Sequence, residues 1–262
     1  MAITIDAVLP AAGRIRGAFA AKAGVEVKAL VSVGGRTVLS RTLSALRATG
    51  RVGRIVIVGP HEVAAHPDAR GASAVLPETE DSGPANILRG LEWLDKAGAA
   101  ARVLVITTDL PFLTPAALVS FLDSAPADQD ICLPVVRRQE CEARFPRLRM
   151  KYVHLRDGDW TIGCAFLVNP RAIRENRDLI ERTFAARKSR LAMARLLGVP
   201  FLLRFLLRRL TVADIEQRAR ELLACPASAV MGCPAELAFD IDGPRDYGYA
   251  VRAFAERGEE AQ

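Results

Sequence analysis

The chain has 262 residues, half of them hydrophobic and a quarter charged, a composition typical of a soluble globular protein that buries one large α/β core. Its net charge is +6, and its few aromatic side chains are not interleaved with Lys/Arg runs. This pattern argues against nucleic-acid binding and favours anionic small molecules as partners. Five scattered cysteines without a Cys-x-x-Cys pair, and no signal peptide, predict reduced thiols in a cytoplasmic protein.

The first predicted element is a buried strand, Ile3–Leu9, which stops at Pro10-Ala11-Ala12-Gly13. Small residues there let the backbone approach a ligand closely, and their N–H groups suit phosphate oxygens. The next stretch has Glu26 as its one acid, and its basic residues are Arg14, Arg16, Lys22 and Lys28. The residues alone leave two interpretations open, a triphosphate cradle or an ordinary strand–helix connection with solvated cations. Neither Gly-x-Gly-x-x-Gly nor a Walker A loop is present.

Strands and amphipathic helices alternate over the first half of the chain. Further strands are predicted at Arg54–Val58, Ala72–Leu76, Val103–Thr107 and Ile131–Val136. Helices are predicted at Val38–Ala48, Ala85–Lys96 and Pro115–Leu122. This alternation predicts an α/β fold with a mostly parallel, doubly wound sheet and helices on both faces. In such sheets ligands gather at the carboxyl ends of the strands.

Asp109 comes directly after one of these buried strands, Val103–Thr107 and the adjoining Thr108. A carboxylate at the carboxyl end of a central strand lies where a metal-bound phosphate would lie. Its hard oxygen ligands suit Mg²⁺. The alternative is a helix-capping aspartate, but the next predicted helix begins later, at Pro115. We therefore expect Asp109 to be a Mg²⁺ ligand.

The character of the chain changes after Val136, where basic residues precede two short strands. The strands Tyr152–Leu155 and Trp160–Val168 predict a β-hairpin inserted into the sheet region. We expect this region to bind an anionic acceptor through Arg137, Arg138 and Gly163. A solvated basic face and a simple strand irregularity at the glycine are the alternatives.

The segment Pro170–Ala224 is almost wholly helical in pattern. Residues 137–225 are therefore expected to form an acceptor-binding and helical insertion within a single domain spanning residues 1–262. Within it, Leu196–Leu210 is apolar but interrupted by arginines, and it is too short for a membrane span. A subunit interface, consistent with a homodimer, or a buried lid helix is favoured over peripheral membrane contact.

The last predicted elements are a strand, Ala235–Ile241, and a helix, Pro244–Glu256. Strand alternation places Asp240 and Asp242 on the same face. One of the two would complete a metal site with Asp109, and the residues do not decide which. Asp242 also stands where it could cap the helix.

Four motifs, in this order, closely resemble the MobA-like nucleotidyltransferases. They are a strand ending in Ala-Ala-Gly, a Lys-Ala-Leu…Gly-Gly segment, a strand ending in Thr-Asp-Leu-Pro-Phe-Leu-Thr and a late Asp-Ile-Asp-x-Pro-x-Asp-Tyr. That superfamily includes molybdenum-cofactor guanylyl- and cytidylyltransferases, methylerythritol-phosphate cytidylyltransferase and sugar-phosphate nucleotidyltransferases. The resemblance covers residues 3–136 and 235–255. It implies a three-layer Rossmann-like fold of the GT-A type with an inserted hairpin and helical segment.

The resemblance also implies the reaction and its nucleotide-binding residues. A nucleoside monophosphate would pass from an NTP, with CTP slightly favoured, to a phosphorylated or anionic small-molecule acceptor, releasing pyrophosphate. Lys28 would contact the α-phosphate, and Arg16 would be a second catalytic cation. The loop that carries Arg16 departs from the family pattern, because its glycine and arginine stand at shifted positions. The nucleotide-binding residues would be Pro10, Ala11, Ala12, Gly13, Arg14, Ser82, Gly83, Asn86 and Thr108.

For the metal, the resemblance implies Mg²⁺ held by Asp109 and Asp242, with Asp240 as the competing ligand. Gly243 stands where the family usually has a threonine. Two other classes of protein stay open. A GT-A-type glycosyltransferase would want Asp-x-Asp at the end of a central strand, where this chain has Asp109 alone. A non-catalytic nucleotide-binding protein is compatible with the altered phosphate loop.

Overall fold

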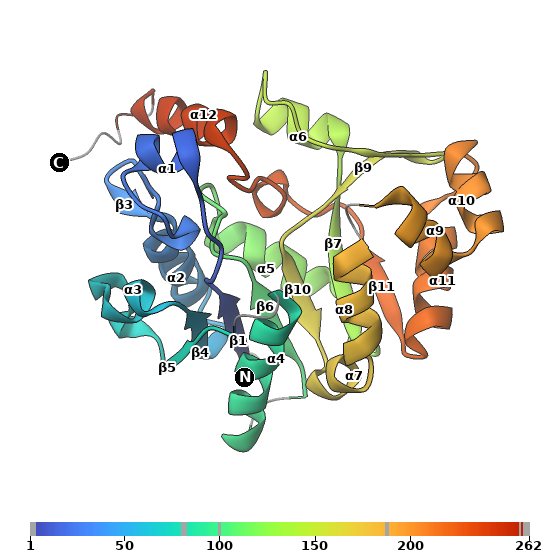
Figure 1. The fold of residues 1–262 in the computed structure, drawn as a ribbon, viewed down its shortest axis with the longest axis horizontal. Helices are drawn as coiled ribbons and strands as arrows, with labels where there is room; N and C mark the ends of the chain where they lie inside the picture. The colour runs from blue at the N-terminus through green and yellow to red at the C-terminus, as the bar shows by residue number, and fades with distance from the viewer. Residues whose placement is uncertain (1–3, 80–82, 99–100, 187–188, 257, 259–262) are drawn as a thin grey trace.

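The computed structural model describes residues 4–79, 83–98, 101–186, 189–256 and 258. Within these residues a single large sheet runs through the molecule (Figure 1). Its strands are β1 (Ile5–Pro10), β4 (Val52–Gly59), β5 (Ala74–Pro77), β6 (Val103–Ile106), β7 (Ile131–Arg137), β8 (Val153–Leu155), β9 (Gly158–Ile162), β10 (Ala165–Val168) and β11 (Ala227–Val230). They lie in the order β5-β4-β1-β6-β10-β7-β9-β8, and β11 pairs with β7.

The half of the sheet from β5 to β6 is parallel, and β1 lies at its centre between β4 and β6. Alternate side chains of β1 enter different cores. Ala7 and Leu9 pack into one hydrophobic cluster, while Val8 packs into the other, and all three are fully buried. A strand that is buried on both faces has a continuous run of apolar residues in its sequence. Because β1, β4 and β6 end at the same edge, the residues after β1 and β6 meet there.

Helices cover both faces of the sheet, as Figure 1 shows. One cluster packs under α2 (Val38–Ala48), α5 (Pro115–Ser124) and α12 (Pro244–Ala255). The other packs under α4 (Gly83–Lys96), α7 (Pro170–Glu175) and α8 (Arg177–Ala186). The helix α5 begins where predicted, since the Thr114 hydroxyl accepts a hydrogen bond from the N–H of Ala117 and Pro115 follows it. The predicted α/β class with a mostly parallel sheet is confirmed.

The helix α4 lies directly on β1 and β4 at Gly90. A methyl group at Gly90 would lie 2.5 Å from Cγ1 of Val8 and 3.3 Å from Cγ2 of Val58. We expect Gly90→Ala to lower the free energy of unfolding by about 1–3 kcal/mol, because the strand side chains must move. The matched control is Gly248→Ala in α12, where a methyl would meet the ends of two flexible side chains at 3.4 and 3.5 Å.

The control should keep or raise the free energy of unfolding, by up to about 1 kcal/mol, because alanine is the better helix former. Urea unfolding of both variants checks this prediction. Equal destabilisation of the two would contradict the packing argument at Gly90.

Residues 131–230 form a lobe at the end of the sheet away from β5, whereas α12 returns to the side of the N-terminal half (Figure 1). The hairpin β8–β9 packs on a small cluster containing Trp160, Leu210 and Val212. The helices of this lobe, in addition to α7 and α8, are α9 (Arg190–Leu197), α10 (Val199–Leu206) and α11 (Val212–Leu223), so the helical pattern over Pro170–Ala224 is confirmed. Among the described residues no helix combines the length and apolarity needed to cross a membrane.

Three segments differ from the prediction. The strand predicted at Ala235–Ile241 is wrong: a 3₁₀ turn, η3 (Ala235–Leu237), leads into irregular chain. The strand predicted at Trp160–Val168 is broken at Gly163, whose N–H donates to the carbonyl of Pro134, so β9 and β10 pair separately with β7. The basic stretch after β1 contains the helix α1 (Gly17–Ala23).

Several short elements follow no periodic pattern and were not predicted. They are η1 (Lys28–Leu30), β2 (Ser32–Val33), β3 (Arg36–Thr37), α3 (His61–Ala65), η2 (Pro67–Gly71) and α6 (Arg138–Arg144).

Candidate active site

The loop after β1 is fixed to the start of η1 by its backbone. The N–H of Ala11 donates to the carbonyl of Val58, and the N–H of Lys28 donates to the carbonyl of Gly13 at 2.8 Å. Arg14 forms an isolated bridge with Val27. A methyl at Gly13 would lie 3.4 Å from Cβ of Lys28, so the small residue lets the lysine stem lie against the loop. The phosphate-loop candidate and Lys28 therefore form one unit.

Lys28 reaches from this unit to two aspartates far away in sequence. Its Nζ lies 2.6 Å from Oδ2 of Asp109 and 2.9 Å from Oδ1 of Asp242. The side chains of Lys28 and Asp109 are 17% and 14% exposed, whereas that of Asp242 is 64% exposed. Charge pairs that are mostly withdrawn from water are screened much less than surface pairs. The structure thus brings together the cationic and carboxylate-bearing segments.

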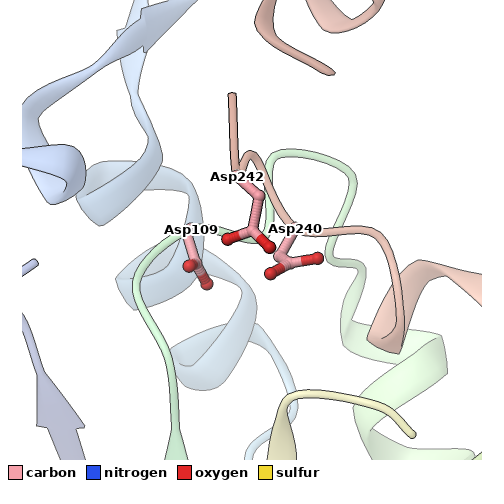
Figure 2. Close-up of side chains that lie close together, drawn as sticks. All are labelled: Asp109, Asp240 and Asp242. Carbon is pink, nitrogen blue, oxygen red and sulfur yellow. The ribbon is translucent and has the colours of Figure 1, made fainter. Parts of the chain in front are cut away.

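Asp109, Asp240 and Asp242 gather at one point, with their carboxylates turned toward one another (Figure 2). One carboxylate oxygen of each lies within 4.8 Å of the other two. Asp109 follows β6, and the Thr107 hydroxyl donates to its Oδ1 at 2.5 Å. The other two precede α12, and the N–H of Ile241 donates to the carbonyl of Asp109. The segment 239–242 is not a strand, yet both of its aspartates reach the site.

An aromatic cluster holds the two carboxylate-bearing segments together. Phe112, three residues after Asp109, lies 5.1 Å from Phe239, the residue before Asp240. Phe112 also stacks on Phe254 of α12 at 5.0 Å, and Phe145 lies 5.1 Å from both Phe112 and Phe239. Such ring pairs add stability beyond the area they bury. The positions of the acids are therefore set by packing beneath them.

The three carboxylates repel one another, and Lys28 compensates only part of that repulsion. Burial, together with the charges of Asp109 and Asp242, raises the pKa of Asp240 to about 7. Burial also opposes ionisation of Asp242, but the hydrogen bond and charge of Lys28 outweigh it and lower the pKa of Asp242. Burial would lower the pKa of Lys28, but Asp109 and Asp242 raise it, so the side chain stays an ammonium.

Asp246 organises the turn that carries Asp242. Its Oδ2 accepts hydrogen bonds from the N–H groups of Asp242, at 3.1 Å, and Gly243, at 2.9 Å. Gly243 is the N-cap residue of α12 and has an extended backbone. The alternative in which Asp242 caps this helix is wrong, because its carboxylate points to Lys28. The cap comes from the third helical residue instead.

Asp246→Ala should release this turn. We expect the free energy of unfolding to fall by about 0.5–2 kcal/mol, the usual cost of a lost N-cap. Asp242 is the predicted Mg²⁺ ligand on this turn, so the metal concentration needed for half-maximal activity is expected to rise when its backbone is no longer fixed. Thermal unfolding and a Mg²⁺ titration of turnover measure the two effects. Asp246→Asn, which keeps a side-chain oxygen acceptor, should recover most of both losses; an equal loss in both variants would contradict the assignment.

Arg14 and Arg16 lie on the outer side of the loop. The Arg14 guanidinium pairs with Glu62 at 2.7 Å and Glu78 at 3.0 Å, and the hydrogen bond that it donates to Glu62 contributes most to raising its pKa. Arg16 is the exposed N-cap residue of α1 and lines a hollow of about 350 Å³ beside Arg14 and Glu26. Neither arginine contacts the acidic cluster in the described residues.

The other predicted nucleotide-binding residues hold the strand ends in place. The Thr108 hydroxyl donates to the carbonyl of Pro10, which joins the ends of β6 and β1. Buried Asn86 accepts hydrogen bonds from the N–H and hydroxyl of Thr79. Gly83 begins α4, and a methyl there would lie 3.1 Å from Phe184. Ser82 lies outside the described residues.

The predicted acceptor residues lie where β7 meets the hairpin. The Arg137 guanidinium lies 4.7 Å from the ring centre of Trp160. Arg138 pairs with Glu142 at 2.8 Å and Asp159 at 3.4 Å. At Gly163 a methyl would lie 2.9 Å from the carbonyl oxygen of Leu237. The absence of a side chain at Gly163 thus lets the backbone at Leu237 come close.

Three residues near the acids were not among the predicted site residues. Thr107 orients Asp109, and the charge of Lys151 helps to lower the pKa of Asp242. Burial raises the pKa of the Cys164 thiol well above its usual range, and the charges of Asp109 and Asp240 add to this. Thr107 could have been found from its position two residues before Asp109, and Lys151 belongs to the basic stretch before the hairpin from which an anionic acceptor is expected, but nothing local signals Cys164.

Comparisons with known proteins agree with this arrangement. The model of the MobA-like NTP transferase domain matches residues 7–229. No curated protein matches the chain. A hypothetical transferase from Thermus thermophilus is 34% identical, with a TM-score of 0.81 over 94% of this chain and 100% of that one.

Two further solved structures share the fold at lower identity. A 2-C-methyl-D-erythritol 4-phosphate cytidylyltransferase from Thermus thermophilus is 22% identical, with a TM-score of 0.55 over 96% of this chain and 98% of that one. A nucleotidyl transferase from Methanothermobacter thermautotrophicus is 20% identical, with a TM-score of 0.55 over 97% and 99%. With the family match over most of its length, the chain belongs to the MobA-like NTP transferase family and is a nucleotidyltransferase.

Proposed function

We propose that the protein transfers a nucleoside monophosphate from an NTP to a phosphorylated or otherwise anionic small molecule, with release of pyrophosphate and dependence on Mg²⁺. The observation that carries the proposal is the ammonium of Lys28 between Asp109 and Asp242, at 2.6 and 2.9 Å. An anionic acceptor oxygen attacks the α-phosphorus, the bond to the bridging oxygen breaks, and pyrophosphate leaves. A phosphate acceptor is already ionised and needs no general base.

The residues of the chain take distinct roles in this reaction. Backbone N–H groups of Ala11, Ala12 and Gly13 bind phosphate oxygens, because small side chains leave them accessible. Lys28 is positioned to stabilise the charge that develops on the α-phosphate. Arg14 and Arg16 are proposed to bind the outer phosphates, which requires Arg14 to exchange its pairing with Glu62 and Glu78. Gly83 and Asn86 belong to the segment 81–86, which the family resemblance implies contacts the base.

The acidic cluster fits a divalent metal ion. Carboxylate oxygens from three aspartates lie within 4.8 Å of one another, and burial together with the charges of Asp109 and Asp242 raises the pKa of Asp240 to about 7. Hard oxygen ligands are those that Mg²⁺ prefers. We propose Asp109 and Asp242 as its ligands, with Asp240 supporting the site. Bound there, Mg²⁺ would supply charge stabilisation to the phosphates.

The acceptor is proposed to bind beside the hairpin, in the segment 137–225, with Arg137, Arg138 and the backbone at Gly163 nearest to it. Stacking on Trp160 holds the Arg137 guanidinium in a fixed plane, and such a plane suits the paired oxygens of a phosphate or carboxylate. Similarity in fold to cytidylyltransferases favours CTP slightly as the donor. The five cysteines are free thiols, in keeping with a cytoplasmic location.

A pyrophosphate-release assay tests the proposal. Each of the four NTPs is supplied with Mg²⁺ and a panel of phosphorylated and carboxylated acceptors, and binding of each NTP is measured by calorimetry. Pyrophosphate release that depends on both acceptor and Mg²⁺ supports the proposal. Tight NTP binding without release over the whole panel favours a non-catalytic nucleotide-binding protein, and turnover of a nucleotide sugar in place of an NTP favours a glycosyltransferase.

A further inference from the structure

The helix α10 is apolar on two opposite sides although it lies on the surface. Phe201 and Phe205 point inward and pack on the cluster of the hairpin that contains Trp160. On the outer side, Val199, Leu203, Leu206 and Leu207 are 62%, 53%, 57% and 62% exposed. Their spacing of three and four residues places them in one stripe along the helix. A helix that is apolar all round normally has both sides covered.

The structure overturns one interpretation of this segment. No residue of α10 is buried, so α10 is not a buried lid helix. The four side chains are exposed, and α10 lies at the end of the molecule away from β5 (Figure 1). Contiguous exposed apolar surface marks a contact with a protein or a membrane.

The sequence that carries the stripe has basic residues but no acids. Between Thr183 and Ala213 the sequence contains seven basic residues and no Asp or Glu. Among the described residues, the exposed members are Arg195 on the preceding helix α9, Arg204 in α10, and Arg208 and Arg209 just after α10. Arg204 pairs with Asp214 of α11, and Arg208 and Arg209 follow the last turn of α10. The surface therefore combines branched aliphatic side chains with a rim of arginines.

This combination disfavours a second copy of the chain. A twofold contact through α10 would set the same arginine-rich surface against itself, and like charges facing each other oppose association. The exposed side chains are also valine and leucine, which are under-represented among the residues that dominate protein interfaces. A short helix with an aliphatic stripe and a cationic rim matches the chemistry of an anionic bilayer surface instead.

We propose that α10 docks the protein on anionic lipid membranes, with Val199, Leu203, Leu206 and Leu207 entering the headgroup boundary. Arg195, Arg208 and Arg209 contact lipid phosphates. An eight-residue helix is about 12 Å long, so it lies in the plane of the interface. Because Phe201 and Phe205 join α10 to the hairpin, docking would present the acceptor side of the molecule to the membrane. This inference does not depend on which NTP or acceptor the site uses.

Vesicle co-sedimentation of the full chain tests the proposal. We expect binding to vesicles of equal parts phosphatidylglycerol and phosphatidylcholine, weakening as salt is raised, and little binding to phosphatidylcholine alone. Leu203→Glu with Leu207→Glu should weaken binding roughly tenfold or more per leucine. Arg208→Gln with Arg209→Gln should weaken it about fivefold per arginine.

A matched control separates the helix from a general change of charge. Met231→Glu with Val251→Glu adds the same two charges at apolar side chains that are 45% and 39% exposed and lie outside α10; it should bind within about twofold of the unchanged protein. Circular dichroism checks that all variants fold. No binding to anionic vesicles, equal loss in the control, or a concentration-dependent dimer that the Leu203/Leu207 variant abolishes would each overturn the proposal.

Discussion

Asp109→Asn is expected to lower the kcat of nucleotidyl transfer by about a thousandfold, since a metal ion supplies several kcal/mol of charge stabilisation to such a reaction. Asparagine keeps the size of the side chain and an oxygen that can accept the hydrogen bond from Thr107. It removes one anionic ligand from the cluster of three carboxylates. The loss should therefore reflect metal binding rather than misfolding.

Pyrophosphate release at saturating NTP, titrated with Mg²⁺, measures this loss. The Mg²⁺ concentration at half-maximal rate should also rise. Asp123→Asn is the matched control, because Asp123 is 54% exposed on α5 and pairs only with Arg51 among the described residues; its kcat should not change. An Asp109→Asn protein with turnover within tenfold of normal and an unchanged Mg²⁺ requirement would remove Asp109 from the metal site.

Lys28→Met should lower kcat by on the order of a hundredfold or more, the usual effect of losing one preorganised group that stabilises developing charge. Methionine keeps much of the stem that lies against Gly13 but has no ammonium. Without substrates, the change also leaves Asp109 and Asp242 without their counter-charge at 2.6 and 2.9 Å. The increase in melting temperature on adding Mg²⁺ should therefore be larger in this variant than in the unchanged protein.

Lys22→Met is the control for Lys28, because Lys22 is an exposed lysine of α1 that lies over the ring of Tyr247. Its kcat and its response to Mg²⁺ should both be unchanged. Lys28→Arg should recover only part of the rate, since a planar guanidinium cannot occupy the same point between the two carboxylates. Unchanged turnover in Lys28→Met would refute the catalytic role of this side chain.

Local signals were sufficient to predict elements with strong periodicity or clear caps. The helix Val38–Ala48 has the predicted bounds, and α5 begins at Pro115 as its Thr-Pro signal indicates. From Phe239 to Asp242 buried and more exposed residues alternate, but the chain between Leu237 and Ile241 contacts Cys164 and Asp109 through single hydrogen bonds rather than a ladder. A period of two therefore predicted a strand where only its pattern of burial exists.

The site was predictable as a set of residues but not as a geometry. Asp109 could be found because it follows a buried strand, and Lys28 because it lies in a basic stretch and in the Lys-Ala-Leu motif of the resemblance. The position of β10, antiparallel between β6 and β7, depends on long-range pairing that no local pattern encodes. For the same reason β11, with the weak sequence Ala-Ser-Ala-Val, was missed, as were the partners of Arg14. Contacts between side chains that are far apart in the sequence, such as Thr37 and Asp68, produce no periodic pattern from which they could be predicted.

The ring contacts of Phe112 with Phe239 and Phe254 have a consequence for how the protein meets its ligands. The three carboxylates would move apart if the segments that carry them were flexible. A cation would then have to bring them together again each time it binds. Here hydrocarbon packing holds those segments in register from the moment the chain folds. A cation can therefore bind to carboxylates whose positions are already fixed, and its binding costs little further ordering of these segments.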